Sequence, residues 1–281
     1  MSESGYSSDE SNCDNFHKEE FSRFKSNYSV ESLLLESANG KLYNAYCKRT
    51  HKEVVVKIIP KKARNMTWLE DGSRVPMEVK MHSIAAAADP TGTVGLLDVY
   101  QRKNDFIMVL EKPQNSIDLL EFVKNYGALS YSAALEVVKQ LARSSLLHRQ
   151  AGVIHRDLKD ENVLFNPATC TCKVIDFGCA GRYNGNIATF VGTDAYAPPE
   201  LLDNKNHHAN IDAVTVYSIG CILFIIVTAT NPFDEEHVFD FQRHILLSPN
   251  LSKQERTILS FLLNPDPNKR IPLSELVELK L

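Results

Sequence analysis

The alternation of hydrophobic and polar residues changes character part-way along the chain. Between residues 28 and 112, short apolar runs separated by polar residues predict strands, and the β-branched run from Glu53 to Ile59 is the clearest. The predicted strands are residues 32–35, 42–47, 53–59, 95–100 and 106–110. Beyond Pro113 the apolar residues recur at helical spacing instead. The predicted helices there are residues 117–126, 130–151, 215–228, 234–246, 253–263 and 273–279.

One helix is predicted among the strands. Residues 71–76 contain polar capping residues and end in Pro76, and apolar residues then recur at helical spacing over residues 77–88. Strands followed by helices predict an α+β fold with two lobes, the first a small antiparallel sheet with one main helix and the second mostly helical. The polar segment Glu111 to Asn115 contains Pro113 and marks the boundary. We therefore expect lobes at residues 26–112 and 113–281.

The first residues differ in composition from the rest. Residues 1–25 are acidic and rich in serine, which predicts a disordered arm. They include no apolar signal segment, and the most apolar stretch, Ile219 to Val227, is about half of the ~20 residues that a spanning helix needs. We therefore expect no membrane association and a cytoplasmic or nuclear location.

The composition of the 281 residues is that of an ordinary globular protein, with 43% hydrophobic and 23% charged residues. A net charge of -4 gives no overall attraction for nucleic acid, and a monomer is the default expectation. The six cysteines are scattered, which favours reduced thiols. Cys170, Cys172 and Cys179 could form part of a zinc site, but no fourth ligand stands at finger-like spacing, so zinc is the minor alternative.

Two motifs contain the side chains needed for phosphoryl transfer. They are His155-Arg-Asp157-Leu-Lys159-Asp-Glu-Asn162 and Val174-Ile-Asp176-Phe-Gly178. This reaction needs a positioned nucleophile, bound metal ions and compensation of phosphate charge. We expect Asp157 to accept or orient the proton of the substrate hydroxyl, and Lys159 to contact the γ-phosphate. Asn162 and Asp176 offer the hard oxygen ligands that Mg²⁺ prefers.

Two predicted ion pairs accompany these motifs. Lys57 lies on a predicted strand and Glu78 on the next helix, where the pair would hold Lys57 against the α- and β-phosphates of ATP. For either residue alone the alternative is an exposed charge, worth ~0 to 1 kcal/mol when paired. The segment Ala197-Pro-Pro199-Glu200 and the distant Arg270 predict a buried pair that fixes the substrate-binding segment.

From about Tyr28 to its end the chain resembles a protein kinase domain, and within that superfamily it is most similar to the Pim serine/threonine kinases. The local features are Arg74-Val-Pro-Met-Glu78, Leu110-Glu-Lys-Pro113, Asp118-Leu-Leu-Glu121-Phe, Gly127-Ala-Leu129 and Lys159-Asp-Glu161-Asn162. The resemblance implies a serine/threonine protein kinase that uses ATP and Mg²⁺. It also implies activity without phosphorylation of the segment between Asp176 and Glu200.

The resemblance further implies nucleotide and substrate contacts. The implied ATP contacts are Leu35, Gly40, Leu42, Val55, Lys57, Leu110, Glu111, Pro113, Leu164 and Asp176. Pro113 has no backbone N–H to donate to adenine, so we expect ATP to lose one hydrogen bond of ~0.5 to 1.5 kcal/mol net.

Acidic residues predict the substrate preference. Asp118 and Glu121 lie one helical turn apart, and Glu161 adjoins the catalytic loop. Together they would attract protein substrates with basic residues upstream of the target, as the resemblance implies. The alternative for the two helix residues is a solvated face.

The glycine-rich loop departs from the kinase pattern. Only Gly40 remains in Leu35-Glu-Ser-Ala-Asn-Gly40, and glycines there let backbone N–H groups close over phosphates. This sustains a second hypothesis, a pseudokinase that acts as a scaffold with weak or no ATP turnover. An active enzyme is favoured by the presence of all five residues expected in catalysis: Lys57, Glu78, Asp157, Asn162 and Asp176. A small-molecule kinase fits poorly, because the segment from Gly192 to Glu200 resembles a peptide-binding segment.

His82 is expected to be a partly buried histidine with a satisfied hydrogen bond.

Overall fold

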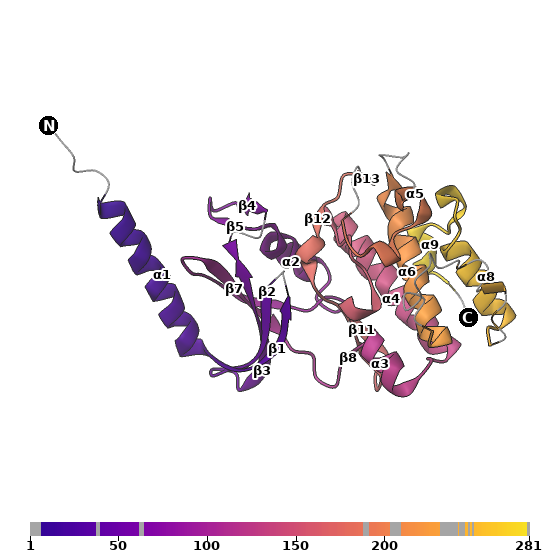
Figure 1. Cartoon of the computed structure of the whole chain (residues 1–281), viewed down its shortest axis with the longest axis horizontal. Helices are drawn as coiled ribbons and strands as arrows, with labels where there is room; N and C mark the ends of the chain where they lie inside the picture. Colours follow the sequence, from indigo (N-terminus) through magenta and orange to yellow (C-terminus); the bar gives the residue numbers. More distant parts are fainter. Residues whose placement is uncertain are drawn as a thin grey trace. The chain divides into compact units, whose positions relative to one another are not determined.

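The chain folds into two compact units (Figure 1). The structure, a computed structural model, describes residues 7–37, 40–61, 65–187, 191–202, 209–230 and 250–279, together with 241, 245, 246 and 248. The first unit comprises residues 1–83 and 94–112, and the second comprises residues 84–93 and 113–281. Residues 84–93, which the sequence placed in the first lobe, belong instead to the second unit, because they hydrogen-bond to its residues. One such bond runs from Val174 N to Gly92 O over 2.7 Å.

The first unit is built on a five-stranded antiparallel sheet, which confirms the α+β prediction. Its strands lie in the order β1-β2-β3-β7-β6, with bounds β1 (Tyr28–Ser37), β2 (Gly40–Cys47), β3 (Lys52–Pro60), β7 (Asp105–Glu111) and β6 (Leu96–Gln101). Each predicted strand overlaps one of these. The β-branched run in β3 occupies the centre of the sheet, where both faces are covered.

The two faces of this sheet have separate apolar cores, because successive side chains of a strand point to opposite faces. Val54 and Val56 of β3 pack with Phe24 and Tyr28 on one face. Ile59 packs on the other face with Val75 and with Val79 of helix α2 (Met77–Ala88). The helix predicted at residues 77–88 is therefore the element that covers this second face.

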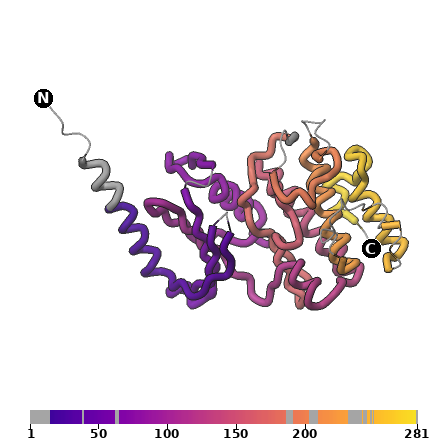
Figure 2. Tube along the Cα trace, viewed as in Figure 1, coloured from indigo at the N-terminus to yellow at the C-terminus, as the bar shows by residue number. Residues whose placement is uncertain are grey.

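The last turns of helix α1 (Ser7–Asn27), with Phe21 and Phe24, pack on the first face. The backbone is helical from Ser7 onward, where the sequence predicted a disordered arm over residues 1–25. Figure 2 shows this helix leading directly into the strands. Phe24 is only 4% exposed and lies edge-on to Tyr100, with ring centroids 5.5 Å apart. Phe21, Phe24 and Tyr28 recur at helical spacing, and this pattern outweighs the acidic, serine-rich composition on which the prediction relied.

A small hairpin precedes α2 where the sequence suggested only the start of a helix. Strand β4 (Met66–Trp68) pairs with β5 (Arg74–Pro76), and Leu69 N donates to Ser73 O over 2.9 Å across the turn. Gly72 in this turn has a φ of 81°. Helix α2 begins at Met77, directly after Pro76, as expected.

His82 on α2 is 2% exposed, and its Nε2 lies 2.7 Å from Val94 O. The predicted buried histidine with a satisfied hydrogen bond is confirmed, and its burial is more complete than expected.

The second unit is mainly helical. Its described helices are α3 (Leu119–Tyr126), α4 (Tyr131–Gln150), α5 (Pro199–Leu202), α6 (Ile211–Thr228), α8 (Lys253–Leu262) and α9 (Leu273–Val277). The helix predicted at residues 234–246 lies outside the described residues except for 241, 245 and 246, which are helical. Short strands form the remaining sheets: β8 (Ile117–Asp118), β10 (Val163–Asn166) and β11 (Thr171–Val174), then β9 (Val153–Ile154) with β12 (Gly181–Arg182), and β13 (Asn186–Ile187) with β14 (Ala209–Asn210).

Helix α6 is the central element of the second unit. It is long and apolar enough to cross a membrane by length and composition, with a mean hydropathy of 2.1, but 78% of it is buried inside the protein. Asn210 caps its first turn by accepting hydrogen bonds from the backbone N–H groups of Asp212 and Ala213. A Cβ at Gly220 would lie 2.8 Å from the side chain of Leu262, so glycine lets α8 approach closely. The burial of this helix shows that it forms the core of the second unit.

Candidate active site

The first unit contains a buried ion pair. Lys57 on β3 is 4% exposed and Glu78 on α2 is 3% exposed, and Lys57 Nζ donates to Glu78 Oε1. Charged side chains are almost never fully buried unless they are paired. The predicted pairing of these two residues is confirmed.

The strand register places five of the expected nucleotide contacts on one face of the sheet. Leu42 of β2 lies opposite both Leu35 of β1 and Lys57 of β3. Val55, two residues before Lys57, lies opposite Leu110 of β7. Because directly opposed residues and residues two apart share a face, these five side chains point the same way.

The hairpin between β1 and β2 keeps its last glycine for a steric reason. Gly40 has a φ of 132°, and a Cβ there would lie 2.3 Å from Ile58 O of β3. The two tip residues, 38 and 39, lie outside the described residues. Leu35 is 57% exposed at the end of β1. Glu111, expected to bind ATP through its carbonyl, accepts a hydrogen bond from Gly95 N at its side chain, over 3.0 Å.

In the second unit, the catalytic-loop motif follows β9 directly and ends in the 3₁₀ helix η2 (Asp160–Asn162). Asp157 Oδ1 accepts two hydrogen bonds from Thr193, from the backbone N over 2.9 Å and from Oγ1 over 2.7 Å. Asn162 Nδ2 donates to Asp157 O over 2.8 Å. These bonds orient the Asp157 carboxylate, and they leave Asn162 Oδ1 as the amide atom able to accept a cation.

Asp176 lies beside this loop within the second unit. Its backbone is left-handed, with a φ of 58°, and its Oδ1 accepts from Gly178 N over 3.1 Å at the start of the 3₁₀ helix η3 (Phe177–Cys179). Ile175 N donates to Asn162 O over 3.0 Å, which ties the two motifs together. Phe177 is fully buried, and the rings of His148 and His155 pack against it.

The donors in this region fit magnesium better than zinc. The carboxylate of Asp176 and the amide oxygen of Asn162 are hard oxygen ligands. Phosphate oxygens can supply the remaining ligands of the metal ion. Among the residues that the structure describes, no three His, Cys, Asp or Glu side chains gather into a metal-binding group. The minor alternative of zinc at Cys170, Cys172 and Cys179 therefore has no support in the described part of the chain.

A second carboxylate links the catalytic loop to the segment before α5. The Tyr196 hydroxyl donates to Asp160 Oδ1 over 2.5 Å. Asp160 lies three residues after Asp157, and Tyr196 lies three residues after Thr193, so this bond runs parallel to the one between Asp157 and Thr193. Asp160 is 1% exposed, and its burial raises the pKa of the carboxyl above the ordinary value. The sequence reasoning missed this pair, because no local pattern marks an aspartate and a tyrosine 36 residues apart as partners.

Lys159 and Glu161 form an ion pair, with Lys159 Nζ 2.5 Å from Glu161 Oε2. Burial by itself lowers the pKa of Lys159, but the hydrogen bond and the charge of Glu161 outweigh it and raise the pKa. The lysine expected to touch phosphate therefore already has a carboxylate partner.

The two acidic residues expected on one helix face differ in role. Asp118 is the N-cap of α3, and its Oδ1 accepts from Glu121 N over 2.8 Å. It also lies opposite Leu164 of β10, an expected nucleotide contact. Glu121 is exposed in the first turn of α3.

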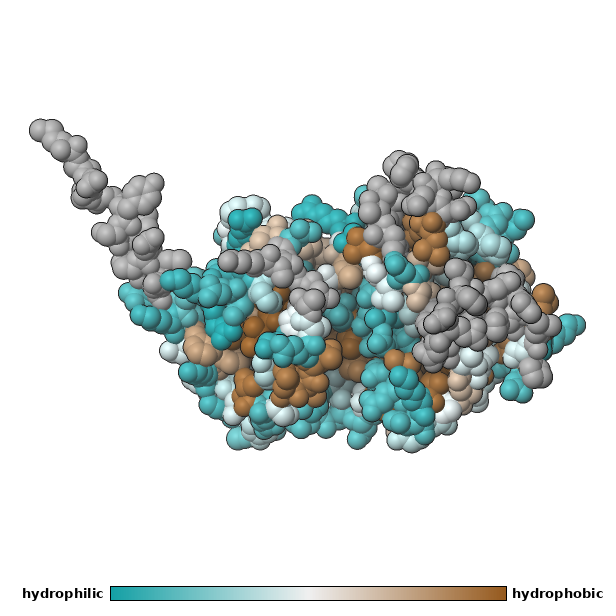
Figure 3. Space-filling view, in the orientation of Figure 1, coloured by the Kyte–Doolittle hydropathy of each residue, from teal (hydrophilic) through white to brown (hydrophobic). Residues whose placement is uncertain are grey.

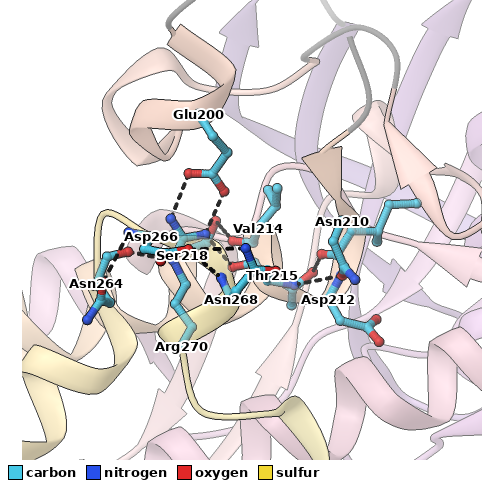
Figure 4. A network of polar contacts seen from close by, with 12 residues as sticks. Glu200, Asn210, Asp212, Val214, Thr215, Ser218, Asn264, Asp266, Asn268 and Arg270 are labelled. Atoms are coloured by element: carbon cyan, nitrogen blue, oxygen red, sulfur yellow. Dashed lines mark hydrogen bonds and ion pairs between the residues drawn. The ribbon is translucent and has the colours of Figure 1, made fainter. Parts of the chain in front are cut away.

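The predicted pair between Glu200 and Arg270 is confirmed, and Figure 4 shows its surroundings. Arg270 Nη1 and Nη2 donate to the two carboxylate oxygens of Glu200, each over 2.6 Å. The guanidinium also donates to Ala213 O over 3.0 Å and to Asn264 O over 2.8 Å. The bidentate pair therefore fixes the start of α5 to α6 and to the segment before α9.

Residues 28–281 match the family model described as the protein kinase domain. The match begins at the first strand and includes the ion pair of the first unit, both motifs of the second unit, and the pair between Glu200 and Arg270. The chain belongs to the protein kinase family.

Individual relatives are serine/threonine kinases by name. The chain is 33% identical over 257 residues to the PAS domain-containing serine/threonine-protein kinase of Mus musculus. The aligned region covers 89% of this chain and 18% of that relative. The chain is 31% identical over 264 residues to the serine/threonine-protein kinase prk-2 of Caenorhabditis elegans, covering 92% of this chain and 58% of the relative. It is also 28% identical over 265 residues to the serine/threonine-protein kinase pim-2 of Danio rerio, covering 91% and 84%. The chain thus spans less than two thirds of the mouse and worm relatives.

Proposed function

We propose that this chain is a serine/threonine protein kinase that transfers the γ-phosphoryl group of ATP, with Mg²⁺, to a hydroxyl group of a protein substrate. The observation that carries the proposal is the orientation of Asp157 by Thr193 and Asn162. The names of the relatives support the choice of serine and threonine as targets.

The carboxylate of Asp157 is suited to receive a proton. Thr193 occupies Oδ1 with two hydrogen bonds, while from the described residues Oδ2 receives only a 3.4 Å contact from Asn162 Nδ2. Oδ2 can therefore accept the proton of a substrate hydroxyl as its oxygen bonds to the γ-phosphorus and the bond from that phosphorus to the bridging oxygen of ADP breaks. Asn162 Oδ1 and Asp176 would hold Mg²⁺, which offsets phosphate charge when bound.

The residues of the first unit would act on the nucleotide. Lys57, held by Glu78, offers its ammonium group to the α- and β-phosphates, and the apolar side chains on the same sheet face suit the adenine ring. Pro113 would cost ATP one hydrogen bond, so we expect weak nucleotide affinity.

A preference for basic peptides follows from the acidic residues of the second unit. Glu161 is paired with Lys159 and Glu121 is exposed. An arginine of the substrate that binds Glu161 bidentately would displace Lys159 and free its ammonium group for the γ-phosphate. Substrate binding and phosphate contact would then be coupled through one carboxylate.

Arg156 supports activity without phosphorylation of the segment after Asp176. Its Nε donates to Cys179 O over 2.6 Å and its Nη2 to Ala180 O over 3.3 Å. A Cβ at Gly181 would lie 3.0 Å from the guanidinium carbon, so the group is enclosed by backbone. Two of the guanidinium donors are therefore already held by carbonyl groups without any phosphate.

The second candidate is the pseudokinase scaffold, which the loss of two loop glycines at Leu35 and Ser37 favours. The test is transfer from radiolabelled ATP, with Mg²⁺, to an arginine-rich serine peptide, beside the Asp157→Asn and Asp176→Asn variants. Transfer that disappears in both variants supports the kinase. No transfer in any sample, together with no shift of melting temperature on adding ATP, supports the scaffold.

A further inference from the structure

A cavity lies within the first unit between helix α1 and the sheet, and none of its lining residues belongs to the candidate active site. Its volume is about 460 Å³. Its lining residues are Phe21, Phe24, Lys25, Tyr28, Ser29, Val30, Lys48, Val56, Ile58, Arg102 and Ile107. This volume lies in the range of about 300 to 1,000 Å³ that is typical of small-molecule sites.

The walls of the cavity are mainly apolar. Seven of its lining residues are hydrophobic, and Val56 and Ile107 are almost completely buried. Val30 at its edge is 43% exposed, and Ile58 is only partly buried. The space-filling view in Figure 3 shows hydrophobic residues gathered on the surface of the first unit over strands β1 to β3. The accessible apolar lining that a ligand could contact is therefore formed by Phe21, Val30 and Ile58.

The polar part of the lining is entirely basic or neutral. Three of the lining residues are cations and none is acidic, although the whole chain has a net charge of -4. Lys48 Nζ donates to Lys25 O over 2.6 Å, and Lys25 Nζ lies 4.4 Å from the ring centroid of Phe21. Among the ion pairs of the described residues, neither lysine has a carboxylate partner, whereas Arg102 pairs with Asp105. Both lysines are exposed, so each ammonium group has donors left for an anion.

We propose that this cavity binds an amphipathic carboxylate, with its acyl chain against Phe21, Val30 and Ile58, whose side chains keep exposed surface, and its carboxylate at Lys25 and Lys48. The charge of the lining matches the anionic head, and the apolar wall matches the chain. The same chemistry could be presented by a free fatty acid or by an anionic lipid in a membrane. The volume of about 460 Å³, which lies in the range of small-molecule sites, favours a single free chain.

Binding would stabilise the first unit. A ligand that binds the folded state alone raises stability by RT ln(1 + [L]/Kd), so the melting temperature must rise with ligand concentration. Helix α1 continues directly into β1 at Tyr28, and both contribute lining residues. A ligand in the cavity would therefore add contacts to both the helix and the sheet.

The test is a calorimetric titration of the full chain with dodecanoate below its micelle concentration. Dodecanol supplies the same chain without the charge, and acetate supplies the charge without the chain. We expect dodecanoate to bind at least about tenfold more tightly than dodecanol, because charge-assisted hydrogen bonds are the stronger ones, and we expect no heat from acetate. Equal affinity for dodecanoate and dodecanol would contradict a basic head-group site.

Variants locate the site. The double variant Lys25→Glu/Lys48→Glu is expected to weaken dodecanoate binding at least about tenfold and to leave dodecanol binding unchanged. Arg49→Glu/Lys52→Glu is the matched control, because both residues are exposed, lie outside the cavity and change the net charge by the same amount. Ile58→Trp is expected to abolish binding of both ligands by filling the cavity, with far-UV circular dichroism verifying that the variant folds.

Vesicles distinguish the two sources of the ligand. Binding to phosphatidylserine vesicles but not to monomeric dodecanoate would refute the proposal in favour of a membrane-surface contact. An equal loss of affinity in both charge-reversal pairs would also refute it, because the attraction would then be non-specific. None of these measurements depends on phosphoryl transfer.

Discussion

The buried pair between Glu200 and Arg270 allows a quantitative prediction of stability. The side chain of Arg270 is 1% exposed and that of Glu200 is 9% exposed. In the Glu200→Ala variant the guanidinium stays buried without its carboxylate. Breaking a buried pair in this way costs about 3 to 5 kcal/mol. Arg270 keeps the carbonyl groups of Asn264 and Ala213 as partners, and its guanidinium lies 4.9 Å from the Tyr217 ring, so we expect the lower end, about 3 kcal/mol.

Urea unfolding followed by far-UV circular dichroism measures this loss, because the described helices of the second unit dominate that signal. With an m-value of about 3 kcal/mol/M, the transition midpoint of Glu200→Ala should fall by about 1 M. Adding Arg270→Met to Glu200→Ala removes the unpaired charge. We expect the double variant to be more stable than Glu200→Ala and the coupling energy to exceed about 2 kcal/mol.

An exposed pair on α4 is the matched control. Lys139 Nζ lies 2.9 Å from Glu136 Oε1, and the two side chains are 20% and 47% exposed. Glu136→Ala should cost less than about 1 kcal/mol. The Glu200 effect should also persist in about 1 M salt, since buried charges are screened little. Equal losses in Glu200→Ala and Glu136→Ala would refute the reasoning.

Further predictions concern the ion pair of the first unit, the glycine hairpin and the second carboxylate of the catalytic loop. Lys57→Met should lower kcat/KM for peptide phosphorylation by about 10²-fold or more, because the phosphates lose their ammonium partner. Near-normal activity would show that Lys57 does not act on phosphate. Gly40→Ala should lower the melting temperature more than Gly127→Ala, because both positions have positive φ but only Gly40 has a backbone oxygen 2.3 Å from the new Cβ; equal shifts would exclude that clash. Asp160→Asn should change how stability depends on pH. The folded-state pKa of Asp160 is raised, so the folded state binds this proton more tightly, and wild type should gain stability relative to the variant as pH falls from 7 towards 4. Parallel stability curves in urea titrations at several pH values would contradict the raised pKa.

The sequence by itself determined the α+β class, five strands of the first sheet and the chemistry of the two motifs. These come from local signals, because the β-branched run over residues 53–59 and the motif spacing from His155 to Asn162 need no knowledge of distant residues. The pair of Lys57 with Glu78 and the pair of Glu200 with Arg270 join residues 21 and 70 positions apart. They were predicted from the types and order of motif residues along the chain, not from a local periodic pattern.

Only the tertiary structure decided the remaining features. Helix α1 forms over a composition that favours disorder, because Phe21 and Phe24 find an apolar sheet face on which to pack. Tyr196 and Asp160 become partners only when the segment before α5 folds beside the catalytic loop. The cavity beneath α1 likewise exists only where the helix and the sheet enclose it. Each of these depends on contacts between residues far apart in the chain, and such contacts form only when burial compensates for the chain entropy lost in bringing them together.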